Sequence, residues 1–154
     1  MLEIKNLTVK VKNDAPILTD VSLSIDEGTC IGLTGASGSG KTTLIKSIMG
    51  MNGGDLEIPQ GQILLDGDNL LTHSAKERRM LCGKTIGFIP QNPMTAFFPH
   101  AKMERQIIET LRMHTGLDKK QAHALAENVL CQVNLTDTKR VLSAYPGELS
   151  GGML

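Results

Sequence analysis

A glycine-rich segment at residues 35–43 carries the strongest chemical signal in the sequence. It reads Gly-Ala-Ser-Gly-Ser-Gly-Lys-Thr-Thr, and its first eight residues match the spacing Gly-x4-Gly-Lys-Ser/Thr of a phosphate-binding loop. Glycines let successive backbone N–H groups turn toward a phosphate, and the positive end of a following helix adds its dipole. The ammonium of Lys41 can reach β- and γ-phosphate oxygens, the Thr42 hydroxyl can complete the coordination of Mg²⁺, and Thr43 can donate to an α-phosphate. The alternative is a glycine turn that has only a structural role. A chance match at all four fixed positions of the motif is rare, which makes this alternative less favourable. The predicted phosphate-binding residues are Gly35, Ala36, Ser37, Gly38, Ser39, Gly40, Lys41, Thr42 and Thr43.

Two weaker signals lie further along the chain. Gln91 follows a predicted strand, and its uncharged amide can hold a water molecule or act as an outer ligand of Mg²⁺ without trapping the metal. Ser150, Gly151 and Gly152 offer a hydroxyl and exposed N–H groups to an anion. Each signal also has a plainer interpretation, because a loop glutamine is usually only solvated and Ser-Gly-Gly can be a helix N-cap and turn.

The elements around the glycine-rich segment follow from the apolar pattern. Alternating apolar residues predict half-exposed strands at 2–11, with one phase slip, and at 21–25, after the breaker at 13–16. The short apolar run 29–34 predicts a strand buried on both faces of a parallel sheet. Residues 42–49 repeat apolar side chains at helical spacing and stop at Gly50. The glycines are therefore expected between a buried strand and a helix, as a phosphate-binding loop requires.

The rest of the chain changes from strands to helices. We expect a short strand at 62–65, a hairpin turn at Asp66-Gly67 and a second buried strand at 85–89 that Pro90 ends. Helical periodicity begins at Ala101, and another helix starts with Asp118 as its N-cap. The sequence thus predicts a β subdomain and loop-bearing core at 1–91, followed by a helical subdomain at 92–154.

Composition excludes several classes of function. Sixteen Lys and Arg residues balance sixteen Asp and Glu residues among 154, which disfavours a nucleic-acid groove or a polybasic membrane patch. The longest apolar runs fall far below the roughly 18 residues of a membrane-spanning helix, and no signal peptide is visible, so we expect the chain to stay in the cytosol. Three scattered cysteines indicate reduced thiols, and no histidine spacing indicates a metal other than Mg²⁺.

The order of the motifs resembles that of the nucleotide-binding subunit of ABC transporters. The glycine-rich loop comes first, Gln91 follows a predicted strand, a helical segment intervenes, and Leu149-Ser-Gly-Gly is the last of the motifs. Residues 91–97, and Tyr145-Pro146 ahead of Ser-Gly-Gly-Met-Leu, look like the branch that energises uptake of peptides, nickel or other chelated metals. The resemblance covers the whole chain. It implies an α/β P-loop NTPase core of the ABC type, with an N-terminal antiparallel β subdomain and a helical subdomain.

The resemblance also implies roles and partners. Residues 35–43 would bind the triphosphate of ATP and Mg²⁺, with Thr42 and Gln91 nearest the metal and with Lys41 and Gln91 taking part in catalysis. Gln91 would also sense the γ-phosphate and couple to transmembrane permease subunits. Ser150, Gly151 and Gly152 would cap ATP bound to a second ATP-binding subunit in a head-to-tail dimer. The implied function is ATP hydrolysis coupled to import at the cytoplasmic face of the membrane, with an extracytoplasmic solute-binding protein as an indirect partner and no nucleic acid.

Two departures from the family pattern qualify these expectations. Residues 10–20 contain no aromatic, where the family usually stacks one on adenine, so base binding would rest on aliphatic side chains such as Val11 and Ile17. The chain stops at Leu154, so the C-terminal part of the domain, with its acidic strand and catalytic Glu, is expected to be missing, and this chain alone is expected not to hydrolyse ATP. The alternatives are a cytosolic ABC-type ATPase without a transporter and a nucleotide-binding fragment without hydrolysis.

Overall fold

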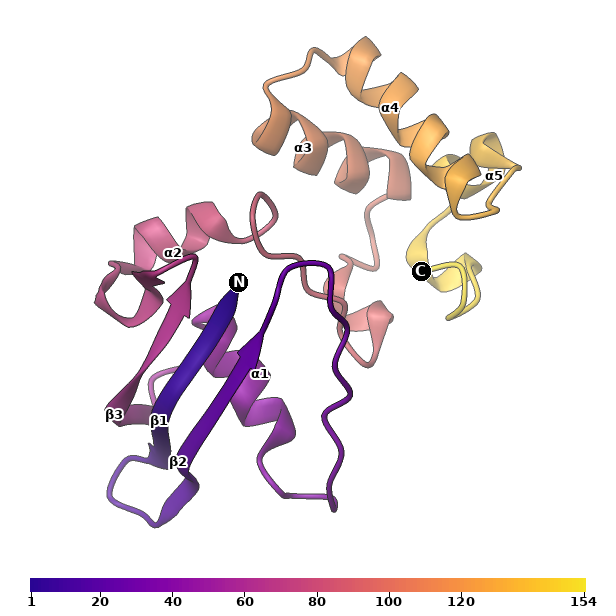
Figure 1. The fold of residues 1–154 in the computed structure, drawn as a ribbon. Helices are drawn as coiled ribbons and strands as arrows, with labels where there is room; N and C mark the ends of the chain where they lie inside the picture. Colours follow the sequence, from indigo (N-terminus) through magenta and orange to yellow (C-terminus); the bar gives the residue numbers. More distant parts are fainter. The chain divides into compact units, whose positions relative to one another are not determined.

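The computed structural model describes residues 1–154, which form two compact units, Met1–Ile86 and Gly87–Leu154. The first unit contains the sheet and the glycine-rich loop, and the second is helical (Figure 1). The subdomain boundary between residues 91 and 92 that the sequence suggests stays a prediction. No helix in the structure is both long and apolar enough to cross a bilayer.

The first unit is built on a four-stranded antiparallel sheet. Its order is β2-β1-β3-β4, with β1 at Leu2–Val11, β2 at Pro16–Ile25, β3 at Leu56–Leu65 and β4 at Asp68–Asn69. The two predicted N-terminal strands are confirmed, with β2 beginning earlier than the predicted 21. The predicted strand at 62–65 is the second half of a longer β3.

The phase slip in the first strand is a bulge. Asn6 has a φ of 49°, and the pairing of β1 with β2 shifts register between Ile4 and Leu7. An extra residue in one strand reverses the alternation of side chains beyond it. Ile4, Leu7 and Val9 therefore all enter the same core, where each is at most 2% exposed.

A tight hairpin joins β3 to β4. Asp66 and Gly67 have φ values of 51° and 85°, and positive values at both central residues characterise the type I′ turn whose twist matches the flanking strands. The predicted turn at this position is confirmed.

Helix α1 (Lys41–Met49) covers the sheet and carries the loop at its N-terminal end (Figure 1). Leu44 is 4% exposed and packs in the same cluster as the apolar residues of β1, β2 and β3. The helix ends at Gly50, whose left-handed conformation lets its N–H bond back to the carbonyls of Lys46 and Ser47. The predicted helix and its stop are confirmed.

Two segments predicted as buried parallel strands, 29–34 and 85–89, form no strand, and this prediction was wrong. Ile31 is 49% exposed and Ile89 is 91% exposed, and the one strand-like contact nearby is an isolated bridge between Cys82 and Ile86. A buried strand needs neighbouring strands that accept its backbone hydrogen bonds and layers that cover both faces. The sheet offers neither segment such a neighbour.

The second unit contains the two predicted helices and a short third one. They are α3 (Met103–Thr115), α4 (Lys119–Gln132) and α5 (Thr138–Ser143). Asp118 caps α4 as predicted, since its carboxylate accepts the Gln121 N–H at 2.8 Å and Gln121 Oε1 accepts the Asp118 N–H at 3.1 Å. The helical core has two buried clusters. One consists of Ile108, Ala122, Ala126 and Leu142, and the other of Met103, Val141, Ala144 and Leu149.

Helix α2 (Ala75–Leu81) in the first unit was not predicted. Ser74 and Glu77 form a capping box at its start, with the Ser74 hydroxyl accepting the Glu77 N–H and the Glu77 carboxylate accepting the Ser74 N–H. These hydrogen bonds to Ser74 hold the pKa of the Glu77 carboxyl below its usual value. The box fixes where α2 begins.

Candidate functional site

The glycine-rich loop runs exposed along residues 35–39 and enters α1 through the buried Gly40. Gly40 has a φ of 89°, which is unfavourable for any residue with a Cβ atom. A Cβ there would also lie 2.5 Å from Leu18 Cδ2, and one at Gly35 would lie 2.9 Å from Ser39 Oγ. Both positions therefore need glycine for the loop to close onto β2 and onto itself.

The N-terminal end of α1 has free hydrogen-bond donors. No side chain caps the helix, its first turn contains no acidic residue, and the first backbone N–H with a partner is that of Leu44, which donates to the Gly40 carbonyl at 2.9 Å. The preceding N–H groups, on residues 41–43, remain available, and the helix dipole places positive potential at this end. Together they form a site suited to an anion.

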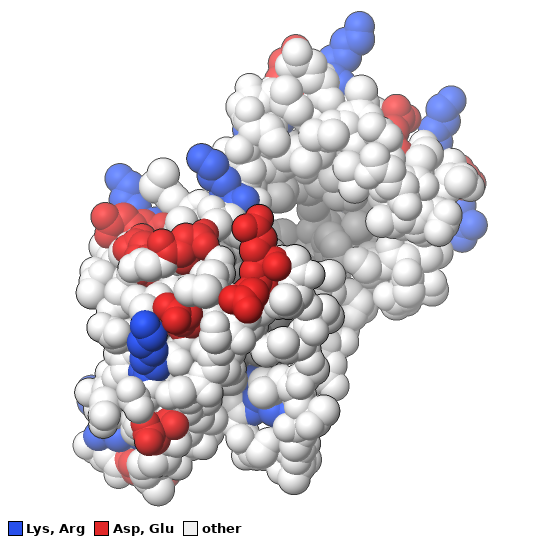
Figure 2. Space-filling view, viewed as in Figure 1, with Lys and Arg blue, Asp and Glu red and all other residues white.

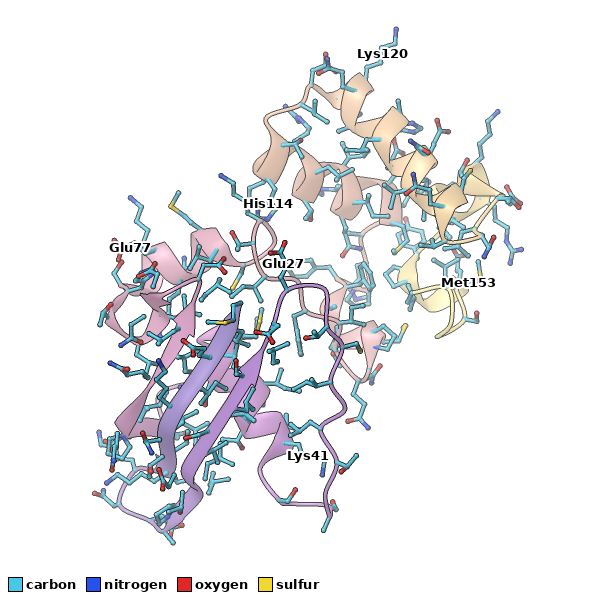
Figure 3. All side chains as sticks on the ribbon, viewed as in Figure 1. Glu27, Lys41, Glu77, His114, Lys120 and Met153 are labelled. Atoms are coloured by element: carbon cyan, nitrogen blue, oxygen red, sulfur yellow. The ribbon has the colours of Figure 1, made fainter.

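Lys41 folds its side chain back over the loop (Figure 3). Its Nζ donates to the carbonyl oxygens of Gly35 and Ala36, both at 2.7 Å, and to Ser39 Oγ at 3.3 Å. An ammonium has three N–H donors, so the loop satisfies all of them. The cation is thereby held within the same turn as the free N–H groups of α1.

The two threonines that follow Lys41 differ in exposure. Thr42 is exposed, whereas Thr43 is half-buried and its carbonyl accepts a 2.8 Å hydrogen bond from the Ser47 hydroxyl. The Thr42 hydroxyl is one oxygen donor in an otherwise open position. Such a donor set fits Mg²⁺ only together with phosphate oxygens and water, which is how this ion usually binds in nucleotide sites.

Gln91 lies in the second unit and is exposed. The residue after it, Asn92, accepts the Met94 N–H at 3.2 Å and starts a short 3₁₀ helix over Pro93–Ala96. Gln91 therefore projects from a loop whose following turn is well defined, while the strand predicted before it is absent.

The segment Ser150–Gly152 follows a 3₁₀ turn at Pro146–Glu148 in the second unit. Leu149 anchors it in the helical core at 7% exposure, and the Met153 N–H donates to the Ser150 carbonyl at 2.9 Å to close the turn. Ser150, Gly151 and Gly152 are exposed. A Cβ atom on either glycine would meet nothing within 4 Å. Packing within the chain therefore does not require glycine here, and the segment is open to the approach of another molecule.

Comparison with known proteins identifies the family. The family model described as "ABC transporter" matches residues 18–154. The chain belongs to the ABC transporter family.

Relatives within the ABC transporter family extend along the whole chain. The ATP-binding protein CntD of a metal-staphylopine import system from Staphylococcus aureus is 35% identical over 155 residues, covering 100% of this chain and 57% of that protein. The dipeptide transport ATP-binding protein DppD from Lactococcus lactis is 36% identical over 157 residues, covering 99% of this chain and 45% of that protein. The chain thus spans about half the length of the curated relatives it matches.

A solved structure shares the fold. It is the dimeric, post-hydrolysis state of an ATP-binding cassette bound to ADP and Pi, with a TM-score of 0.80 and 24% identity, covering 99% of this chain and 65% of that chain. The α/β core of the ABC type expected from the sequence is confirmed at the level of the fold.

Gln106 organises part of the second unit, and the sequence did not predict this role. Gln106 on α3 accepts the Phe98 N–H at 2.8 Å and donates to the carbonyls of Phe98 and Ala101 at 3.1 and 2.7 Å. It thereby orders the loop between the short 3₁₀ helix and α3. No pattern in the sequence marks a glutamine for this role, since its partners are backbone atoms.

Proposed function

We propose that this chain is the nucleotide-binding part of the ATP-binding subunit of an ABC importer, which couples ATP hydrolysis to uptake of peptides or metal chelates such as those of nickel. The observation that carries the proposal is the loop at 35–40, with the Lys41 ammonium over it and the free N–H groups of α1 beside it. The names of the relatives, a metal-staphylopine importer and a dipeptide transporter, support the class of solute.

The loop and the first turn of α1 supply the groups that a bound triphosphate needs. The N–H groups of residues 41–43 and the helix dipole would hold phosphate oxygens, and Lys41 would move its ammonium from the loop carbonyls to the β- and γ-phosphates. Thr42 would offer its hydroxyl to Mg²⁺. When bound, Mg²⁺ would neutralise charge on the β- and γ-phosphate oxygens. Gln91 would provide an amide as γ-phosphate sensor and outer Mg²⁺ ligand.

We further propose that Ser150, Gly151 and Gly152 cap ATP held by a second ATP-binding subunit in a head-to-tail dimer. Their exposure and the open space around both glycines support this role, because close approach of a phosphate is what a missing Cβ permits. The dimeric state of the related cassette supports the assembly.

We propose permease subunits as the second class of partner. Binding to them would hold the chain at the cytoplasmic face of the membrane. The second unit carries an apolar groove, and Phe98 and Met113, which line it, are 76% and 79% exposed. Large exposed apolar side chains around one groove are typical of a surface that contacts another protein. The solute-binding protein would act through the permease.

The test is binding of Mg-ATP by isothermal titration calorimetry to the wild-type chain, to Lys41→Ala and to Lys46→Ala. Lys46 is the matched control, because it is an exposed lysine in the last turn of the same helix. Loss of a charge-assisted hydrogen bond to phosphate should weaken binding by Lys41→Ala on the order of tenfold or more. Lys46→Ala should bind as the wild type does. Equal affinities of all three proteins, with unchanged circular dichroism, would contradict the site.

A further inference from the structure

The loop that joins α1 to β3 contains the sequence Asn52-Gly53-Gly54. Among the asparagines of the chain, only Asn52 is followed by glycine. The pairing matters because the backbone nitrogen that follows an asparagine can attack the carbonyl carbon of that asparagine's side chain. A Cβ atom on the following residue hinders this approach, and glycine has none. The sequence therefore makes Asn52 the asparagine most open to the reaction.

The backbone nitrogen of Gly53 is free to attack. The N–H groups of Gly50 and Met51 donate to carbonyl oxygens near the end of α1, at 3.2 and 2.8 Å, but the Gly53 N–H donates to no acceptor. Gly53 is exposed and has a φ of 63°, and a Cβ atom added to it would meet nothing within 4 Å. Neither a hydrogen bond nor a neighbouring side chain thus blocks this nitrogen.

The side-chain amide of Asn52 is not held by its oxygen. Its Oδ1 atom is buried and has no hydrogen-bond partner, an arrangement that costs free energy. By contrast, the Oδ1 atom of Asn69 accepts the N–H groups of Ile63 and Leu71, at 3.4 and 3.2 Å. Because the Asn52 oxygen accepts no donor, the amide breaks no hydrogen bond at this atom when it turns toward Gly53.

A guanidinium lies beside the same loop. Arg78 on α2 approaches Gly50 so closely that a Cβ added to Gly50 would lie 3.1 Å from Arg78 Cδ and 3.4 Å from its Nε. This Nε is also buried without a hydrogen-bond partner. Gly50 comes two residues before Asn52, so at most about 7 Å of chain separates them. A positive charge here favours the negative charge that develops on the amide oxygen during attack and that remains in the product.

We propose that Asn52 is a modification site, which loses its amide through a cyclic imide closed by the Gly53 nitrogen, with Arg78 stabilising the charge. The Gly53 nitrogen gives its proton to hydroxide and bonds to Asn52 Cγ. The bond from Cγ to Nδ2 then breaks, and ammonia leaves with a proton from water, which regenerates hydroxide. Water opens the imide at either carbonyl carbon and gives aspartate or isoaspartate. The net reaction takes up one water and releases one ammonia.

The product carries one more negative charge than the original chain. The formal net charge of the chain is zero, and Figure 2 shows side chains of both signs on the first unit. One added carboxylate therefore makes the modified chain anionic near neutral pH, and ion-exchange chromatography can separate it from the unmodified chain. Since hydroxide takes part in the first step, the rate should increase with pH.

The first measurement follows the amides of the full 154-residue chain at neutral and at mildly alkaline pH. Trypsin cuts after Lys46 and Lys76, so one peptide contains both Asn52 and the internal control Asn69. Fragment masses should show conversion at Asn52 about tenfold faster than at Asn69 or more, equivalent to about 1.4 kcal/mol in the barrier. Similar rates at the two asparagines would overturn the proposal, as would a rate at Asn52 that does not increase with pH.

The second measurement uses a free peptide of residues 48–56, which reports what these residues do without the fold. We expect the chain to react at least as fast as the peptide, because the loop leaves the Gly53 nitrogen free and adds the charge of Arg78. A chain that reacts more than about tenfold slower than the peptide would show that the fold protects Asn52, and would overturn the proposal.

Two pairs of variants test the mechanism, with circular dichroism as the control for folding. Gly53→Ala should slow the reaction about tenfold or more, whereas Gly54→Ala, whose Cβ would also meet nothing within 4 Å, should stay within about twofold of the wild type. Arg78→Gln should slow it about two- to tenfold, and Arg79→Gln, at the exposed next position of α2, should not. A wild-type rate in Gly53→Ala would overturn the imide route, and equal rates in the two arginine variants would overturn the role of Arg78.

Discussion

Replacing Gly40 with alanine should destabilise the first unit through two separable effects. The new Cβ would force an L-residue to keep a φ of 89° and would overlap Leu18 Cδ2 at 2.5 Å. A left-handed conformation costs about 1–2 kcal/mol and overpacking of a core about 1–3 kcal/mol, so Gly40→Ala should lower the free energy of unfolding by about 2–5 kcal/mol. Gly28→Ala isolates the first effect, because Gly28 has a φ of 74° and nothing within 4 Å of its Cβ position.

The assay has to report on the unit that holds Gly40. Tyr145 lies in the other unit, so its fluorescence would miss the change, and amide hydrogen exchange of β1 is the suitable probe. Leu18→Val removes the overlapping methyl group, so the double variant should be more stable than the summed single losses by about 0.5–3 kcal/mol. Equal losses for the two alanine variants, together with strict additivity in the double variant, would refute the overlap.

Three further outcomes follow from the site and its supports. Gln91→Ala should leave nucleotide affinity within about twofold but lower solute uptake by the assembled transporter, because Gln91 is proposed as an outer ligand that senses the γ-phosphate, whereas Lys41 and the N–H groups of α1 hold the phosphates. Uptake at the wild-type rate would remove Gln91 from the mechanism. Gly151→Ala should leave the unfolding free energy of this chain within about 0.5 kcal/mol, since its Cβ meets open space, while reducing ATP turnover by the assembled transporter. Unchanged turnover would contradict the capping role. Gln106→Ala should cost about 1–3 kcal/mol in urea unfolding because backbone groups lose their partners, whereas the exposed Gln132→Ala should cost almost nothing.

Elements specified by nearby residues could be predicted from the sequence. Alternation predicts the strand at 2–11 and the second half of β2, at 21–25. The hairpin is predicted by Asp66-Gly67, and α1 and α4 by their stop and cap signals. Helix α2 could have been found from the Ser74 and Glu77 spacing of its capping box. These signals act within a few residues, so they hold whatever the rest of the chain does.

Features that depend on distant partners could not be predicted. The runs at 29–34 and 85–89 have the composition of buried strands, but a strand forms only where another accepts its hydrogen bonds. The motif at 35–43 identified the candidate phosphate loop, yet nothing in it shows that Lys41 would bond to the carbonyls of Gly35 and Ala36. Backbone acceptors have no residue type and so leave no trace in a sequence pattern.

The bonds that Lys41 makes to its own loop determine what can open that loop. An arriving molecule has to replace two carbonyl oxygens and a hydroxyl, so its binding is an exchange of one set of oxygens for another. When an anionic oxygen replaces a neutral carbonyl oxygen as acceptor, the attraction between the two opposite charges is added to the hydrogen bond. Sugars and other neutral polyols gain little by this exchange, whereas phosphates gain at each oxygen. At the proposed site, Lys41 would therefore favour anionic ligands over neutral ones.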